Sequence, residues 1–151
     1  MSDLTLIIPA KNEKESLPIV LDELCKFNFK KNVILEASDK LTIEAIKSYD
    51  CKIIFQDSKG YGDALKKGIE SVTTEFFCIF NADGSFDPSC LDKMVSKCSN
   101  GYDFIFASRY EKNGGSEDDM HMYYDDNGGD TPEGPGELAD FIGEIVTGTW
   151  T

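Results

Sequence analysis

Short apolar runs alternate with stretches of helical periodicity through the first 107 residues of the chain. Apolar positions at i, i+3, i+4 and i+7 indicate one face of a helix, and short continuous apolar runs are typical of buried strands. The pattern predicts strands at residues 4–9, 33–36, 53–56, 76–80 and 102–107. It predicts helices between them, with apolar faces formed by Leu17, Val20, Leu21 and Leu24; by Thr42, Ala45, Ile46 and Tyr49; by Ala64, Leu65, Gly68, Ile69 and Val72; and by Leu91, Met94, Val95 and Cys98.

Local start signals refine two of the helices. Asp87 followed by Pro88 predicts an N-cap and a first helical residue, since proline needs no backbone donor there. In the first helix either Asn12 or Ser16 is a candidate cap. Pro18 favours the later start, because proline belongs in a first turn.

Alternating strands and helices predict an α/β fold, a mostly parallel sheet with helices on both faces. Ligands of such sheets bind outside the carboxyl ends of the strands. Polar clusters follow the predicted strands at these ends: residues 11–13, 36–39, 57–62, 81–85 and 108–109. The sequence therefore predicts a binding site along this edge.

Charge and composition divide the chain near residue 110. Residues 1–110 carry 17 acids and 14 bases, a net charge of −3, whereas residues 111–151 carry 11 acids and one base, a net charge of −10. We expect one α/β domain over residues 1–110. Residues 111–151 are expected to form an acidic, glycine-rich loop and a short helix with Leu138, Phe141, Ile142 and Ile145 on one face, not an independent domain.

Composition also excludes several classes of function. The chain has one arginine and no basic patch, so nucleic-acid binding is not expected. Its five cysteines include no Cys-x-x-Cys pair, and His121 has no cysteine or second histidine nearby, which argues against a disulfide framework or a zinc site. No run approaches the roughly 18 apolar residues that cross a bilayer. We expect a soluble, cytoplasmic protein without a transmembrane segment, and leave peripheral association with a membrane surface open.

Two turns carry candidate chemistry. Gly60-Tyr61-Gly62 precedes a helix, but the third glycine of a dinucleotide-binding fingerprint would fall at Leu65, so that fingerprint is absent. Lys59 and the exposed backbone amides of this turn could still bind an anionic group. A turn without a ligand is an equal alternative. Asn81 and Asp83 place two oxygen-bearing side chains at a strand end, which suits Mg²⁺ or Mn²⁺ together with a diphosphate. Locally, a solvent-facing turn is the simpler interpretation.

Four stretches in order carry a resemblance to a known family: Leu4-Thr5-Leu6-Ile7-Ile8-Pro9-Ala10-Lys11-Asn12-Glu13, residues 59–68, residues 81–88, and Ala107-Ser108-Arg109-Tyr110 with Gly114-Gly115. Residues 4 to about 119 resemble the family 2 inverting glycosyltransferases, particularly the dolichyl-phosphate mannosyl- and glucosyltransferase branch. The resemblance implies the glycosyltransferase A-type fold, a nucleotide-diphospho-sugar donor and a divalent cation. It also implies transfer with inversion to a polyprenyl phosphate or saccharide acceptor.

The resemblance also implies roles for individual residues. The nucleotide would be bound by Pro9, Lys11, Glu13, Glu36, Lys59, Gly60, Gly62, Asn81 and Arg109; the metal by Asp83 and Asn81; and the general base would be Asp118 or Asp119. Two positions depart from the family pattern. Asn81 replaces the first metal carboxylate, and Leu35-Glu36-Ala37-Ser38 stands where Asp-Asp-x-Ser is usual, so Glu36 is an approximate substitute.

Two alternatives stay open at this point. The chain could be a truncated or degenerate module that binds a nucleotide-sugar without efficient transfer. It could also be a sugar-phosphate nucleotidyltransferase, although a glycine-rich, arginine-bearing loop does not follow the first strand, where residues 9–13 stand instead. The base, the sugar and the acceptor depend on pocket shape and are not predicted.

Overall fold

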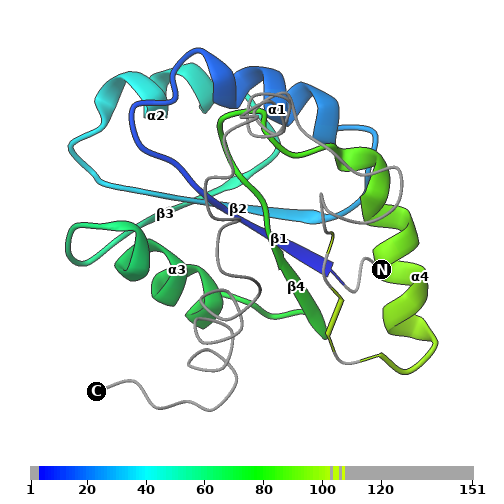
Figure 1. The fold of residues 1–151 in the computed structure, drawn as a ribbon. Coiled ribbons are helices and arrows are strands. Elements are labelled where there is room, and N and C mark those ends of the chain that lie inside the picture. The colour runs from blue at the N-terminus through cyan, green and yellow to red at the C-terminus, as the bar shows by residue number, and fades with distance from the viewer. Residues whose placement is uncertain (1–3, 103, 106, 108–151) are drawn as a thin grey trace, which may run out of the picture. The chain divides into compact units, whose positions relative to one another are not determined.

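The computed structural model describes residues 4–102, 104, 105 and 107 (Figure 1). Within them strands and helices alternate along the chain. The elements are β1 (Leu4–Pro9), α1 (Ser16–Leu24), β2 (Lys30–Leu35), α2 (Lys40–Ile46), β3 (Lys52–Phe55), α3 (Tyr61–Glu70), β4 (Phe76–Ile79), a 3₁₀ turn (Pro88–Cys90) and α4 (Leu91–Ser99).

The described strands form one four-stranded sheet in the order β3-β2-β1-β4. All three strand pairs are parallel, with Ile7 opposite both Asn32 of β2 and Ile79 of β4. The four carboxyl ends therefore lie along one edge of the sheet. Because β2 and β4 flank β1 on opposite sides, the direction of winding reverses at β1, which is where open parallel sheets bind ligands.

Helices cover both faces of the sheet, as the sequence predicts (Figure 1). On one face Leu6 and Ile8 of β1 join the buried residues of α1, α2 and α4 in a single apolar cluster. On the other face Ile7 and Ile34 pack with Ala64 of α3. Alternate residues of β1 thus face opposite layers, and Leu4 to Ile8 are all buried, which explains the continuous apolar run.

Gly68 sets the distance between α3 and the sheet. A Cβ atom at this position would lie 2.3 Å from Ile7 Cγ2 and 3.2 Å from Ile34 Cδ1. Glycine therefore lets the helix backbone approach β1 and β2 closely, and this contact fixes where the N-terminus of α3 meets the carboxyl edge.

Several predicted boundaries were wrong. Strand β3 begins and ends one residue earlier than predicted, at Lys52 and Phe55, and β4 ends at Ile79. Strand β2 begins at Lys30 and ends at Leu35, so Glu36 follows it. Ser16 is the first residue of α1, while Glu15 occupies the N-cap without a side-chain bond; neither Asn12 nor Ser16 is the cap. The prediction at Asp87 is confirmed, because its side chain accepts a hydrogen bond from Ser89 N and Pro88 follows.

The predicted strand at residues 102–107 was also wrong at its described positions. Residues 102, 104, 105 and 107 have no strand conformation, and Tyr102 and Phe104 are exposed. Strand preference depends strongly on context, and the described strands of the sheet are β1 to β4. No helix in the described part of the chain has the length and apolar character needed to cross a membrane. The predicted helix at 138–145 lies outside the described residues.

Candidate functional site

A cavity of about 460 Å³ opens at the carboxyl edge of the sheet, and all four strand ends contribute to its wall. Its lining residues are Pro9, Ala10, Lys11 and Glu13 after β1; Glu36 after β2; Gln56 after β3; Gly60, Tyr61 and Ala64 at the start of α3; and Asn81, Ala82 and Asp83 after β4. The cavity thus collects polar side chains from four separate segments.

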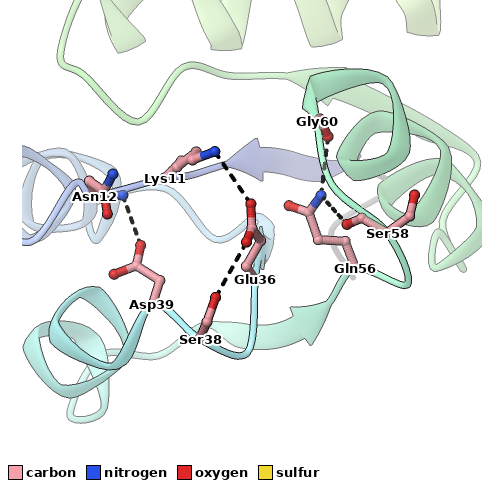
Figure 2. Close-up of polar contacts among 8 residues, drawn as sticks. All are labelled: Lys11, Asn12, Glu36, Ser38, Asp39, Gln56, Ser58 and Gly60. Carbon is pink, nitrogen blue, oxygen red and sulfur yellow. Dashed lines mark hydrogen bonds and ion pairs between the residues drawn. The ribbon is translucent and has the colours of Figure 1, made fainter.

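The loop after β1 is fastened to the start of α2. Asn12 has a positive φ of 59° and its backbone N donates to Asp39 Oδ2 at 2.8 Å (Figure 2). The next amide, Glu13 N, donates to Thr42 Oγ1 at 3.1 Å. These two bonds hold an otherwise unfavourable backbone conformation, and the Lys11 ammonium then lies 3.4 Å from Glu36 Oε1.

Asp39 connects this loop to the helix. Its second carboxylate oxygen, Oδ1, accepts from Thr42 N at 3.3 Å as the N-cap of α2. Burial raises the pKa of the Asp39 carboxyl, but the hydrogen bonds from Asn12 and Thr42 together lower it below its ordinary value. The carboxylate form is therefore favoured in the folded chain, where both oxygens accept backbone amides.

Gln56 continues the sheet beyond β3 and fixes the following loop. Its backbone N donates to Leu35 O at 3.1 Å, which places it beside Glu36. Its side-chain Nε2 donates to Ser58 O at 2.9 Å and to Gly60 O at 3.1 Å (Figure 2). Gly60 has a φ of 103°, a conformation that favours glycine, so the turn leading into α3 needs this residue.

The turn after β4 is bonded within itself. Asn81 Nδ2 donates to Ser85 Oγ at 3.2 Å, and Ser85 N donates to Asp83 Oδ1 at 2.9 Å. The hydrogen bonds from the Ser85 side chain and backbone lower the pKa of the exposed Asp83 carboxyl. The Asn81 amide nitrogen is engaged, so its carbonyl oxygen is left to act as a ligand beside an ionised carboxylate.

Asn81 and Asp83 suit a cation that shares its coordination with a ligand. No group of three or more His, Cys, Asp or Glu side chains that could hold a metal occurs among the described residues. Mg²⁺, however, is usually bound by one or two carboxylates together with substrate phosphates and water. One carboxylate and one amide oxygen at a strand end fit this mode and do not fit a closed protein cage.

Most of the described residues implied by the resemblance meet in this cavity. Its wall contains Pro9, Lys11, Glu13, Glu36, Gly60, Asn81 and Asp83, but neither Lys59 nor Gly62. Lys59 lies in the β3–α3 loop and Gly62 in the first turn of α3. The positions predicted for Arg109, Asp118 and Asp119 lie outside the described residues. Gln56, Tyr61 and Asp39 were not predicted as individual site residues. Asp39 and Tyr61 lie within the polar clusters 36–39 and 57–62 predicted at this edge, and the signal for Gln56 was a glutamine after the apolar run of β3.

A second depression, of about 610 Å³, lies away from this edge. It is lined by Lys26, Phe27, Asn28 and Phe29 of the α1–β2 connection, Ser89 of the 3₁₀ turn and Asp92 of α4. Its aromatic rings stack on each other, with centroids 5.6 Å apart. Side chains from several strand ends do not converge there, so the carboxyl-edge cavity is the better candidate site.

Comparison with known proteins agrees with this geometry. Residues 5–145 match the family described as Glycosyl transferase family 2. The chain belongs to this family. The parallel sheet with helices on both faces is consistent with the A-type fold of such glycosyltransferase domains, and the expected fold class is confirmed.

Relatives in the family are similar at modest identity. Two proteins described as uncharacterized glycosyltransferases, from Mycobacterium tuberculosis and Mycobacterium bovis, are each 29% identical over 106 residues, covering 70% of this chain and 48% of the relative. A dolichyl-phosphate hexose transferase from Haloferax volcanii is 22% identical over 112 residues, covering 73% of this chain and 49% of the relative. The chain thus spans about half the length of these curated relatives.

Proposed function

We propose that this chain forms the donor-binding part of a glycosyltransferase that takes one sugar from a nucleotide diphosphate. The proposal rests on one cavity that is lined by residues following all four parallel strands. The Lys11–Glu36 ion pair lies in one part of its wall, and Asn81 and Asp83 lie in another. A nucleoside and a diphosphate are chemically different parts of one ligand. The nucleoside would bind beside Lys11 and Glu36, and the diphosphate beside Asn81 and Asp83.

Family membership and geometry together suggest which residues bind each part. Pro9, Lys11 and Glu36 would contact the nucleoside, and the exposed ring of Tyr61 at the cavity wall offers it an aromatic surface. The diphosphate would lie at Asn81 and Asp83 and be held there through Mg²⁺ or Mn²⁺. Such a cation would neutralise negative charge on the departing diphosphate.

Transfer with inversion requires a nucleophile on the face of the sugar opposite the diphosphate. A hydroxyl acceptor on a saccharide would need a base, for which Asp118 and Asp119 are our candidates. A polyprenyl phosphate would need none, since the second pKa of a phosphate monoester is about 6. The name of the Haloferax volcanii relative, a dolichyl-phosphate hexose transferase, supports testing a lipid phosphate acceptor first.

Ligand-induced stabilisation tests the donor site directly. Nucleoside diphosphates and nucleotide-sugars, each with and without Mn²⁺, should raise the melting temperature, because only the folded chain offers the cavity. A ligand at 100 times its dissociation constant adds about 2.7 kcal/mol of stability. If no nucleotide in the panel shifts the transition at millimolar concentration, the donor-site proposal is wrong.

The second candidate function is nucleotide-sugar binding without efficient transfer. It is favoured by Asn81, a neutral ligand at the position where the resemblance expects a carboxylate. Release of free nucleoside diphosphate, measured with a polyprenyl phosphate and with simple sugars, separates the two functions. Acceptor-dependent turnover of about 1 per second or more, the ordinary enzyme range, supports transfer; binding without acceptor-dependent release supports the binding module.

A further inference from the structure

Three polar side chains stand in a row along one wall of the cavity. Lys11 follows β1, Glu36 follows β2 and Gln56 follows β3. Because these strands are neighbours in the order β3-β2-β1, the side chains are presented in the order Lys11, Glu36, Gln56 along the carboxyl edge. All three line the same cavity, and Figure 2 shows Lys11 and Gln56 on either side of Glu36.

Each of the three side chains offers the cavity either a hydrogen-bond donor or an acceptor, but not both. The Lys11 ammonium can only donate, and the Glu36 carboxylate with which it forms an ion pair accepts. Gln56 would ordinarily do both, but its Nε2 is committed to the carbonyl oxygens of Ser58 and Gly60. The reverse amide orientation would turn its oxygen toward those two carbonyl oxygens, so the Gln56 carbonyl oxygen is left facing the Glu36 side (Figure 2). The row therefore reads donor, acceptor, acceptor.

Two neighbouring acceptors need a ligand that brings two neighbouring donors. The Glu36 side chain is only 19% exposed; its Oε1 meets the Lys11 ammonium at 3.4 Å and its Oε2 accepts from Ser38 Oγ at 3.3 Å. Each oxygen can accept a further hydrogen bond, so a ligand donor placed against Glu36 or Gln56 is satisfied and a ligand oxygen is not. Such mismatches discriminate between ligands, because a ligand acceptor facing these oxygens gains no hydrogen bond for the water that it displaces. Lys11 beside Glu36 supplies the donor that a ligand carbonyl would require.

The nucleobases differ in this pattern along their pairing edges. Guanine presents acceptor, donor, donor from O6, N1–H and the exocyclic amine, which complements the row at every position. Uracil presents acceptor, donor, acceptor, so its O2 would meet the Gln56 oxygen. Cytosine presents a donor followed by two acceptors, and adenine presents one donor followed by one acceptor. Neither matches.

We propose that the wall of Lys11, Glu36 and Gln56 selects a guanine nucleotide as the donor. The inference rests on the proposed donor function and adds the identity of the base. Lys11 would donate to guanine O6, Glu36 would accept from N1–H, and Gln56 would accept from the exocyclic amine.

Calorimetry with five nucleoside diphosphates in the presence of Mn²⁺ tests the base. GDP should bind tightest, and UDP, CDP and ADP should each bind at least about tenfold more weakly. IDP has the same ring without the exocyclic amine, so it isolates the contact to Gln56. One neutral hydrogen bond corresponds to a loss of about 2- to 10-fold in affinity.

Two variants at Gln56 separate this contact from the structure of the loop. Gln56→Leu removes the acceptor and should bring the GDP to IDP affinity ratio to about 1. Gln56→Glu keeps an acceptor but cannot donate to Ser58 and Gly60, so it should retain the ratio. Both variants lose the bonds to the loop, and a loop defect weakens GDP and IDP alike, so the ratio reports the base contact alone.

The outcomes distinguish this inference from the proposed function. Binding of UDP as tight as or tighter than GDP, or equal affinity for GDP and IDP in the unaltered chain, overturns the guanine inference and leaves the donor site standing. Absence of binding by all five nucleotides overturns the donor site and the inference with it. Preference for GDP over IDP that survives in Gln56→Leu overturns the role of Gln56.

Discussion

The two ends of the cavity are built differently. The β1–β3 wall (Lys11, Glu36 and Gln56) is held by contacts between separate elements, with the loop after β1 tied to α2 and Gln56 tied to the start of α3. In the β4 turn (residues 81–85), the polar contacts of Asn81 and Asp83 are made to Ser85 of the same turn. The wall is therefore organised before a ligand arrives, whereas the β4 turn has oxygen ligands in place but is supported only locally.

This difference assigns different tasks to the two ends. A prearranged wall discriminates between ligands, since its groups do not move to accommodate a wrong pattern. A locally supported turn adjusts its two oxygens to a cation that brings its own remaining ligands. Mutations at the two ends should accordingly fail in different ways, and the following experiments are ordered by expected size.

The largest effect is expected at Asp83. Asp83→Asn keeps an oxygen for Ser85 N but removes the charge, so the Mn²⁺-dependent part of nucleotide affinity should fall about 10- to 100-fold, the range known even for groups that only support metal ligands. Asn81→Asp should raise it. Calorimetry with and without Mn²⁺ measures both.

Asp92→Asn is the matched control, since Asp92 is an exposed acid of α4 outside this cavity. Its affinity should equal that of the unaltered chain. Equal affinities in all four proteins would mean that the β4 turn is merely structural, and the contrast between the two ends would disappear.

The second largest effect is expected at Gly68, where α3 packs against β1. Gly68→Ala forces a methyl group to within 2.3 Å of Ile7 Cγ2, and such overpacking typically costs about 1–3 kcal/mol of unfolding free energy. Because α3 begins at the cavity, its displacement should also weaken nucleotide binding. Urea unfolding and calorimetry on one variant report both quantities.

Gly62→Ala is the control in the same helix, where a Cβ would meet nothing within 4 Å. It should be neutral or stabilising by up to about 1 kcal/mol, the helix-propensity difference between the residues. A loss of stability at Gly62 equal to that at Gly68 would show that backbone propensity, and not the approach to β1, decides the role of Gly68.

The location of the cavity could be predicted from the sequence because it follows from the arrangement of the strands. Parallel strands bring their carboxyl ends to one edge, so Lys11, Glu36 and Asn81 were expected together before any side chain was placed. Gln56 was not recognised, because its role depends on which atoms its amide nitrogen contacts. The strand expected at 102–107 was wrong at its described positions, because apolar content alone does not decide whether a run adopts strand conformation.

Asp39 shows a second limit of the sequence. Its contact with Asn12 spans 27 residues, and nothing in the local pattern of either segment indicates it. A polar cluster after β2 was noted, yet which member would support the loop after β1 depends on the packing of α2 beside α1. Long-range polar contacts of this kind require coordinates.

The third prediction tests that contact. Asp39→Ala removes the N-cap of α2 and the acceptor for Asn12, and should cost about 1–2 kcal/mol of stability together with nucleotide affinity. Asp39→Ser restores a capping oxygen, but its shorter side chain is not expected to reach Asn12. It should recover part of the stability, measured by urea unfolding, and little of the affinity, measured by calorimetry. Full recovery of both by serine would mean that only the cap matters.

The smallest effect is a pH dependence that separates the two ends. The pKa of Asp39 is lowered in the folded chain because the hydrogen bonds from Asn12 and Thr42 outweigh its burial. A carboxyl group whose folded pKa lies below its unfolded value contributes stability that is fully present above the unfolded pKa, ordinarily near 3.9, and is lost as the pH falls through the folded value. The stability difference between the unaltered chain and Asp39→Asn should therefore be constant from pH 7 to about 5 and shrink below about 4.

The pKa of Asp83 is lowered too, but Asp83→Asn should change unfolding stability less at every pH, because its carboxylate joins no second element. Thermal unfolding of the three proteins between pH 3 and 7 measures these differences. A larger, pH-independent difference for Asp83→Asn than for Asp39→Asn would reverse the contrast, making the β4 turn the more firmly built end of the cavity.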